Sequence, residues 1–190
     1  MFERYGHSLN PEEYWVEFTS KGKGIAGEVE RHNLKLKADP IDMRKQKFEV
    51  YSRFCESGTI KLFPGATELV ERLSKVFSIS IASGSWTKDI RSILKGQSAE
   101  HLFQIILGKE SAPREKPHPD IFLEAAKQMD LDPEVCFVVE DALKGLTAAK
   151  KAGMKCAVIR NPLNMNIDFP EADIEFPSLT EFLDFIKNNI

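Results

Sequence analysis

Cysteine is scarce in this sequence, which holds three cysteines in 190 residues and no C-x-x-C pair. Cys136 and Cys156 lie within apolar runs, where cysteine behaves as a small hydrophobic residue. A nucleophilic role is disfavoured for Cys55, Cys136 and Cys156, because none has a nearby basic residue that would obviously lower its pKa. We expect all three to be core thiols in a reducing cytoplasm.

Long hydrophobic runs and an excess of positive charge are also missing. No stretch approaches the roughly 18 apolar residues of a membrane span, and residues 1–6 do not resemble a signal peptide. The 26 Lys and Arg residues are outnumbered by 29 Asp and Glu residues, giving a formal net charge of -3. Such a chain has no basic field for nucleic acid or an anionic membrane. We therefore expect a cytoplasmic protein with neither as a partner.

The hydrophobic pattern divides the chain in two. Residues 1–57 contain three expected helices, which begin at Asn10-Pro11, at Ile25 and at Asp39-Pro40. Residues 58–190 alternate strands and helices, which indicates βαβ units and a parallel α/β sheet. The expected strands are 78–82, 105–107, 135–139, 155–159 and 174–176, and the expected helices are 66–75, 88–94, 119–129, 142–151 and 179–188.

Two adjacent carboxylates, Glu140 and Asp141, end the apolar run 135–139. Ligands bind at the carboxyl ends of the strands in parallel sheets, so these acids mark a candidate site. Mg²⁺ prefers hard oxygen ligands, often one or two carboxylates completed by water and phosphate. In a plainer interpretation, Asp141 merely caps the helix that begins at Ala142.

Two further candidates lie at or near strand ends. Ser83 and Gly84 directly follow the expected strand 78–82, where a hydroxyl and free backbone amides can hold an oxyanion. Lys116 precedes Pro117 and Pro119, which restrict the backbone and fix the ammonium group beside the acids. The alternatives are an ordinary strand-to-helix turn and a solvated lysine.

These segments together resemble the haloacid dehalogenase-like hydrolases, in the branch of β-phosphoglucomutase and small sugar-phosphate phosphatases. The motifs that carry the resemblance are Phe63-Pro64-Gly65, Ile81-Ala82-Ser83-Gly84-Ser85, Lys116-Pro117-His118-Pro119-Asp120-Ile121-Phe122 and Val138-Val139-Glu140-Asp141-Ala142-Leu143-Lys144-Gly145 through to Gly153-Met154. The resemblance implies a three-layer α/β/α Rossmann-like core over 58–190 and a small helical cap domain over 1–57.

The same resemblance implies roles for individual residues. Ser83 and Gly84 would bind the phosphoryl group, Lys116 would neutralise its charge, and Glu140 with Asp141 would hold Mg²⁺. Ser83 and Lys116 are thus the expected catalytic residues. The turn that contains Lys21, Gly22 and Lys23, together with Trp86, corresponds to family positions where substrate selectivity resides.

One part of the family pattern has no counterpart in this sequence. The family's first core strand ends in Asp-x-Asp-Gly, whose first Asp attacks phosphorus and whose second acts as general acid and base. Asp39-Pro40-Ile41-Asp42 and Asp130-Leu131-Asp132 do not replace it, because cap and turn chemistry explains both. The chain as written is expected to be inactive, as a shortened chain or one with a misplaced start.

The missing strand also leaves the closure of the sheet open. In the family this strand lies between the strands that end at Ser83 and at Glu140. Its absence requires direct pairing of those neighbours, a strand borrowed from a partner, or an unstable sheet. We expect a monomer unless a partner strand completes the sheet.

The leading functional hypothesis is a Mg²⁺-dependent phosphohydrolase that acts on a small phosphorylated metabolite. A β-phosphoglucomutase-like phosphomutase is the nearest variant. From another class, the chain could be a non-catalytic relic that binds phosphate or a protein partner. A dehalogenase is less favoured, because it needs no metal and so no acidic pair.

Overall fold

The first helices begin at the side-chain caps that the sequence predicts. The computed structural model describes residues 2–35 and 39–190. Asn10 accepts a hydrogen bond from the Glu13 amide at 3.1 Å and is followed by Pro11, and Asp39 accepts one from the Ile41 amide at 2.8 Å and is followed by Pro40. Both caps satisfy amides that lack a partner within the helix.

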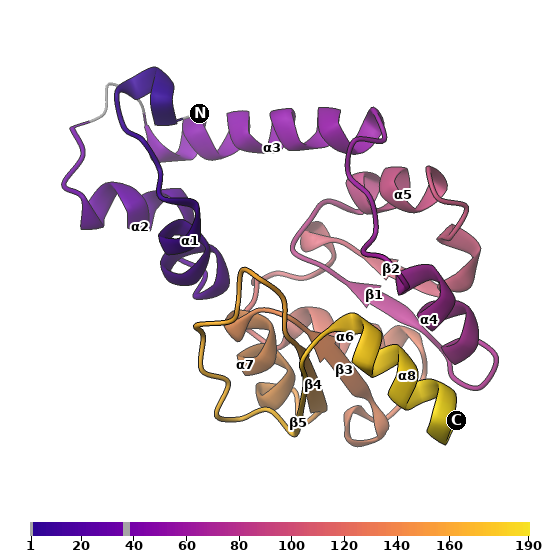
Figure 1. Cartoon of the computed structure of the whole chain (residues 1–190). Helices are drawn as coiled ribbons and strands as arrows, with labels where there is room; N and C mark the ends of the chain where they lie inside the picture. Colours follow the sequence, from indigo (N-terminus) through magenta and orange to yellow (C-terminus); the bar gives the residue numbers. More distant parts are fainter. Residues whose placement is uncertain (1, 36–38) are drawn as a thin grey trace.

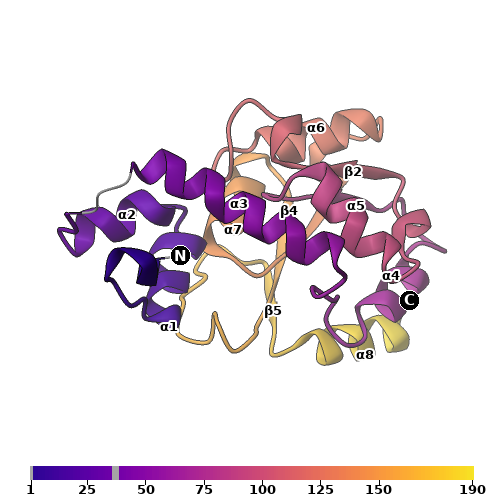
Figure 2. The ribbon, with the colours of Figure 1, turned by 90° about the horizontal axis from the view of Figure 1, so that it is seen from above.

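The described elements up to residue 56 are all helical, and Figure 1 shows them above the strands. They are a 3₁₀ turn Phe2–Tyr5, α1 Pro11–Glu13, a π-helical segment Tyr14–Ser20, α2 Gly24–Arg31 and α3 Pro40–Glu56. Figure 2 shows α3 running lengthwise past α5, against which it packs. The boundary at residue 57/58 between a cap and a core domain stays a prediction.

The remainder of the chain alternates strands and helices. The strands are β1 Ser80–Ala82, β2 Ile105–Leu107, β3 Phe137–Glu140, β4 Lys155–Ile159 and β5 Ile174–Phe176. The α-helices are α4 Ala66–Leu73, α5 Thr87–Lys95, α6 Asp120–Gln128, α7 Leu143–Lys151 and α8 Leu179–Asn189, and short 3₁₀ turns span Glu100–Leu102, Lys109–Ser111 and Pro133–Val135. Every strand pairing is parallel, as the βαβ pattern predicts.

The strands form two separate sheets, in the orders β1-β2 and β3-β4-β5. Within the described residues β1 and β3 have no ladder between them, so each is an edge strand. Val138 is 8% exposed, whereas Phe137 and Val139 on the opposite side of β3 are 54% and 44% exposed. Direct pairing of β1 with β3, one of the closures considered from sequence, is therefore not how this structure is built.

Helices cover both faces of β4 and pack against the other strands, although the Phe137 and Val139 side of β3 stays exposed. α6 and α7 pack on one face, in a core that includes Leu107, Val138, Cys156 and Val158. On the other face α5 covers β1 and β2, while α4 and α8 cover the β4-β5 side. Successive β4 residues alternate between these layers, as side chains of a strand must. The result is the predicted three-layer α/β/α arrangement.

Two strands near the site begin two residues later than predicted, and the first is β1, which was expected from residue 78 and begins at Ser80. The apolar run was expected to be a strand from Val135, but Pro133–Val135 is a 3₁₀ turn and β3 begins at Phe137. Asp132 accepts a hydrogen bond from the Glu134 amide at 3.0 Å, and this cap together with Pro133 favours the turn. At its other end β3 runs one residue further than predicted, so Glu140 is its last residue rather than the residue after it.

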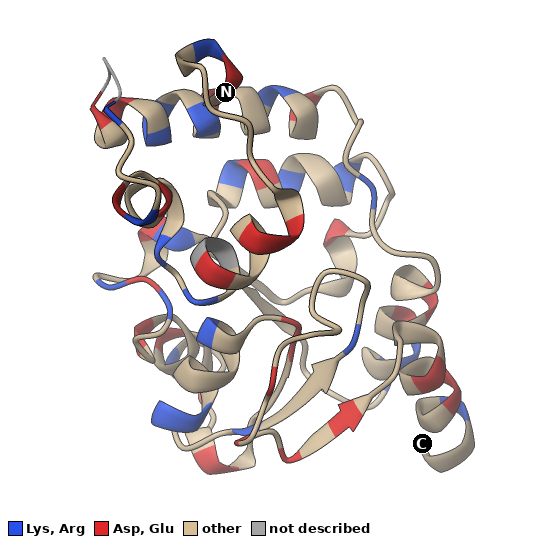
Figure 3. Cartoon of the chain, turned by 60° about the vertical axis from the view of Figure 1, so that its left-hand side comes forward, with Lys and Arg blue, Asp and Glu red and all other residues tan. Residues whose placement is uncertain are grey.

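The predictions made from composition concern the cysteines, membrane spans and charge. Cys55 and Cys156 are buried, but Cys136 is only half-buried because it follows the 3₁₀ turn. Within the described ranges the structure contains no helix long and apolar enough to cross a membrane. Figure 3 shows acidic and basic residues distributed over the helices of both parts of the chain.

Candidate active site

Lys116 connects the two separate sheets at their carboxyl ends. Its ammonium group donates to the backbone carbonyl of Ala82 in β1 at 3.0 Å and forms a short ion pair with Oε1 of Glu140 in β3. The Lys116 and Glu140 side chains are 10% and 11% exposed. The ring of Phe122 in α6 lies 4.4 Å from the ammonium nitrogen. The expected juxtaposition of Lys116 with the acids is thus present, and the cation is largely shielded from water.

Glu140 is held between this lysine and the start of α7. An ideal Cβ on Gly145 would lie closer than 3.0 Å to the Glu140 carboxylate, so only glycine leaves the space that this carboxylate occupies. The other carboxylate oxygen, Oε2, faces the Asp141 amide at 3.4 Å. Glu140 therefore has a defined position, with its charge turned towards Lys116.

Asp141 is half-buried. Its pKa is raised above the ordinary value, mainly by burial and secondly by the neighbouring Glu140 charge. Its side chain does not cap α7, whose N-terminal cap is Ala142 without a side-chain hydrogen bond. The plainer interpretation of Asp141 as a helix cap is therefore wrong. Asp141 thus has a half-buried carboxylate that takes no part in capping α7.

The loop after β4 fixes Asp141 in place. Asn161 donates to Oδ2 of Asp141 at 3.3 Å, and the fully buried Asn164 donates to the Asp141 carbonyl at 2.9 Å. Asn164 also donates to the Ile159 carbonyl at 2.9 Å and accepts from the Asn161 amide at 2.8 Å. Sequence reasoning missed both asparagines, although Asn161 lies just beyond the carboxyl end of a predicted strand.

Ser83 and Gly84 follow β1 directly, next to the carbonyl that accepts from Lys116. The Ser83 hydroxyl accepts a hydrogen bond from the Ser85 amide at 3.1 Å, which turns the chain at this point. An ideal Cβ on Gly84 would meet nothing within 4 Å, so the turn is open on that side. The turn therefore shares the edge of the sheet with Lys116, and the phosphate-binding role of Ser83 stays a prediction.

The turn after the π-helical segment approaches the site from the N-terminal helices. Gly22 has a φ of +85°, a conformation that favours glycine, and a Cβ there would lie 3.8 Å from both the Lys116 carbonyl and the Lys144 side chain. Ser20 accepts from the Leu143 amide at 2.9 Å. The predicted selectivity turn thus lies over Lys116.

The other predicted selectivity residues differ in their surroundings. Lys21 forms an exposed pair with Glu17 at 2.8 Å, and Lys23 precedes α2 without a side-chain cap. Trp86 packs edge-on against Phe48 of α3 and lies 4.8 Å from the Lys109 ammonium group. Trp86 therefore contacts α3, one of the N-terminal helices, while Lys21 pairs with Glu17.

The structure places a second lysine, Lys144, near the acids, and the sequence did not predict it as a site residue. Lys144 is half-buried, and burial lowers its pKa below the ordinary value. Lys144 lies in the motif that runs from Val138 to Met154. Because an amphipathic helix commonly carries such lysines, its sequence context did not indicate a place in the site. The site thus contains two cations and two carboxylates.

Comparison with known proteins places this geometry in a family. The model of the family described as haloacid dehalogenase-like hydrolase matches residues 1–159. A CBBY-like protein of Arabidopsis thaliana is 35% identical over 138 residues, which are 70% of this chain and 43% of that protein. The chain thus spans less than half the length of this relative.

Solved structures extend the likeness over nearly the whole chain. The structure of CbbY from Rhodobacter sphaeroides in complex with phosphate is 25% identical and has a TM-score of 0.78. The match covers 95% of this chain and 84% of that one. A CbbY mutant in complex with xylulose-1,5-bisphosphate gives 25% identity and a TM-score of 0.76, over 93% of this chain and 83% of that one. Because the family model matches most of the chain's 190 residues, this chain belongs to the haloacid dehalogenase-like hydrolases.

Proposed function

We propose that this chain is part of a Mg²⁺-dependent phosphohydrolase that acts on a small phosphorylated metabolite. The observation that carries the proposal is the position of Lys116, whose ammonium group contacts both Ala82 and Glu140 beside Asp141. A fixed, poorly hydrated cation next to a carboxylate pair suits a dianionic phosphate whose charge must be neutralised during transfer. The similarity to a protein solved with phosphate and with a sugar bisphosphate supports this substrate class.

Mg²⁺ fits the residues at this edge. Glu140 and Asp141 supply carboxylate oxygens, the hard ligands that Mg²⁺ prefers. The raised pKa of Asp141 arises from burial and from Glu140, and a bound cation would offset both. When bound, Mg²⁺ would neutralise phosphoryl oxygens and orient the phosphate. Because Glu140 already pairs with Lys116, we assign the principal ligand role to Asp141.

The chain's own residues would then divide the remaining tasks. Lys116 would bind a phosphoryl oxygen and hold Glu140, while the Ser83 hydroxyl and the open backbone at Gly84 would donate to another oxygen. Gly22 and the turn around it would meet the non-phosphorylated part of the substrate, opposite Lys116. Trp86, between cap and core, would limit its size.

The nucleophile is not among these residues. The unpaired facing edges of β1 and β3 support a place for one further strand, and a strand there would end beside Lys116. We propose that the active protein has such a strand, carrying Asp-x-Asp, and that the chain as written is inactive without it. The division into a cap over 1–57 and a core over 58–190, and the cytoplasmic location, belong to the same proposal.

The test compares the chain alone with the chain extended at its N-terminus by a strand that ends in Asp-x-Asp-Gly. Phosphate release from p-nitrophenyl phosphate and from a panel of sugar phosphates is measured with and without Mg²⁺. We expect release only from the extended protein with Mg²⁺, and loss of at least about 100-fold with Lys116→Met or Asp141→Asn. An extended, folded protein that releases no phosphate from any compound would favour the non-catalytic relic.

The same extended protein distinguishes a phosphatase from a phosphomutase. A mutase must exclude water from the phosphorylated intermediate. Two contacts between the proposed cap and core would help to do so: Ser20 accepts from the Leu143 amide, and the Tyr51 hydroxyl lies 3.4 Å from the Ser85 hydroxyl. Conversion of a sugar 1-phosphate into its 6-phosphate without phosphate release would establish the mutase.

A further inference from the structure

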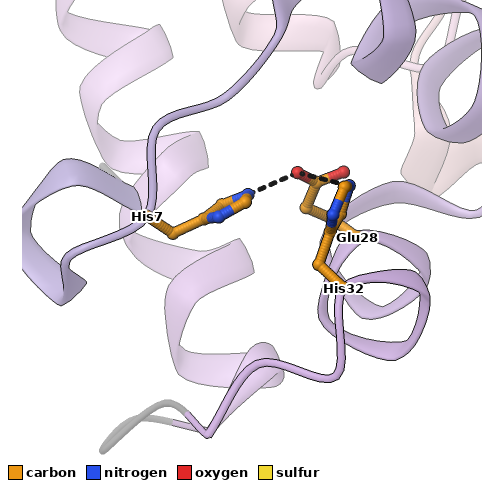
Figure 4. Close-up of side chains that lie close together, drawn as sticks. All are labelled: His7, Glu28 and His32. Atoms are coloured by element: carbon orange, nitrogen blue, oxygen red, sulfur yellow. Dashed lines mark hydrogen bonds and ion pairs between the residues drawn. The ribbon is translucent and has the colours of Figure 1, made fainter.

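Three side chains that commonly bind metals meet in the cap, apart from the site around Lys116. Figure 4 shows His7 opposite Glu28 and His32, with the three polar ends turned towards one another. His7 lies in the segment before α1, Glu28 lies in α2, and His32 is the residue after α2. One ligating atom of each lies within 4.8 Å of those of the other two. Two segments of the cap thus share one cluster of nitrogen and oxygen atoms.

Local structure explains how the cluster forms. Glu28 and His32 are four residues apart, so they lie on the same side of α2. The ring of the buried Phe2 packs edge-on against His7 with 5.5 Å between centroids, and the rings of His7 and His32 are 5.2 Å apart. The packing of Phe2 therefore holds His7 over α2.

The cluster is poorly satisfied by hydrogen bonds alone. Glu28 is only 2% exposed, and its Oε1 lies 2.6 Å from Nε2 of His7. Nε2 of His32 is 3.6 Å from the same oxygen, and Oε2 of Glu28 has no hydrogen-bond partner in the described part of the chain. A buried carboxylate oxygen without a partner is destabilising, because nothing replaces the hydrogen bonds that it made to water. A cation placed between the three groups would remove this cost.

We propose that His7, Glu28 and His32 form a zinc site that ties the N-terminal segment to α2. Zn²⁺ accepts imidazole nitrogen and carboxylate oxygen, and two histidines with one carboxylate plus water make a tetrahedral set. Mg²⁺ and Ca²⁺ prefer all-oxygen sites, so the two imidazoles favour zinc. The occupant is therefore a different metal from the one proposed for Glu140 and Asp141.

Zinc binding requires all three separations between the ligating atoms to reach about the same value, and the one between His7 and His32 lies within 4.8 Å here. Two ligands bound at roughly 2.0–2.1 Å in a tetrahedral site lie about 3.3 Å apart. The distance from His7 to Glu28 must open from 2.6 Å, while the distance from His32 to Glu28 must close slightly from 3.6 Å. His7 lies outside any helix, so it can move by this amount without breaking helical hydrogen bonds.

Glu13 provides a control close to the cluster. Its Oε1 lies 3.6 Å from Nε2 of His32 but is paired with the guanidinium of Arg31 at 2.7 Å. We therefore exclude Glu13 from the ligand set. Glu13→Gln removes a nearby charge without removing a ligand, and His101→Gln removes a histidine from a different part of the chain.

The experiment titrates Zn²⁺ into the intact chain in competition with a chelating dye, for the wild type and for His7→Gln and His32→Gln. We expect the wild type to bind one more equivalent than either variant, or to bind that equivalent at least about 100-fold more tightly. Glu13→Gln and His101→Gln should match the wild type within about threefold. Zinc bound at the core carboxylates or thiols is common to all five proteins and cancels in the comparison.

A second measurement separates lost binding from lost folding. Thermal unfolding without metal should give similar midpoints for the wild type and His32→Gln, because the His32 side chain is 34% exposed. Zinc should raise the midpoint of the wild type more than that of His32→Gln, since a ligand bound to the native state stabilises it. Equal zinc affinity and equal zinc-induced stabilisation in the wild type and both histidine variants would overturn the proposal.

Discussion

At the scale of single residues, the site depends on charges that are withdrawn from water. Lys116 and Glu140 are each about nine-tenths buried and pair with one another, so neither charge is left alone. Such a pair adds little stability compared with apolar residues, but removing one partner exposes the full cost of burying the other. Stability by itself therefore does not explain why two charges are buried there.

We predict that Lys116→Met lowers the free energy of unfolding by about 3 kcal/mol, because it leaves Glu140 charged, buried and unpaired. Lys116→Met/Glu140→Gln should recover at least about 1 kcal/mol of this loss. Urea denaturation of both variants provides the measurement. Arg44→Met is the control, since Arg44 and Glu115 form a pair in which both side chains are about half exposed, and it should cost less than about 1 kcal/mol. Equal stability of the single and double variants would contradict the prediction.

Gly145 is a second residue whose identity the Glu140 carboxylate dictates. In an ordinary helix, Gly→Ala stabilises by up to roughly 1 kcal/mol. Here the added methyl group would overlap the Glu140 carboxylate, which Lys116 holds in place, so Gly145→Ala should destabilise by about 1–3 kcal/mol. The midpoint of urea denaturation measures the sign. Gly84→Ala, where the methyl group meets nothing within 4 Å, should change stability by less than about 0.5 kcal/mol.

At the scale of elements, short loops after the strands do most of the positioning. The loop after β4 uses one fully buried side chain, Asn164, to join the carbonyls of Asp141 and Ile159 with the amide of Asn161. It thereby fixes the ends of β3 and β4 relative to one another. The acid beside Glu140 is presented at a constant position because of this loop.

Asn164→Ala should therefore affect both folding and metal binding. Buried backbone groups that lose their partners cost roughly 1–3 kcal/mol each, so we expect a loss of about 3 kcal/mol in unfolding free energy. Mg²⁺ affinity, followed by calorimetry, should fall roughly 10-fold because Asp141 is less well held. Asn189→Ala in α8, which is exposed, serves as the control and should change neither quantity. Wild-type Mg²⁺ affinity in Asn164→Ala would show that the loop does not position Asp141.

At the scale of the whole molecule, the interrupted sheet is the dominant feature. β1 pairs only with β2 and β3 only with β4 among the described residues, while α6 and α7 pack against each other beneath both sheets. The helical layer and Lys116 thus hold two half-sheets together without a ladder between them. An edge strand leaves every second amide unpaired, so both edges are open to another strand.

Hydrogen exchange tests this arrangement. Amides of β1 and β3 that point away from their partner strands should exchange at least about 100-fold faster than those of the central strand β4. An N-terminal extension that supplies the proposed Asp-x-Asp strand should protect these same amides, while β4 stays unchanged. Mass spectrometry of peptides that cover 78–83 and 136–141 provides the measurement. Equal protection of β1, β3 and β4 in the chain as written would contradict an open gap.

Much of this architecture follows from local sequence patterns. The ranges 105–107, 155–159 and 174–176 were predicted to the residue, because short apolar runs lie between clear helix patterns and turns. The start of β3 was predicted two residues early, because Val135 extends the apolar run although Pro133 and the Asp132 cap impose a turn. Hydrophobicity alone does not reveal such a turn.

The sequence by itself determined the alternation of elements, the family motifs, and the presence of Lys116, Glu140 and Asp141 at or near strand ends. These are properties of neighbouring residues, and periodicity and spacing record them. Only the tertiary structure decided that Asp141 is held by Asn161 and Asn164, that the sheet is divided, and that His7 meets Glu28 and His32. These contacts join segments about 20 or more residues apart, and their partners are selected by packing and burial rather than by local pattern.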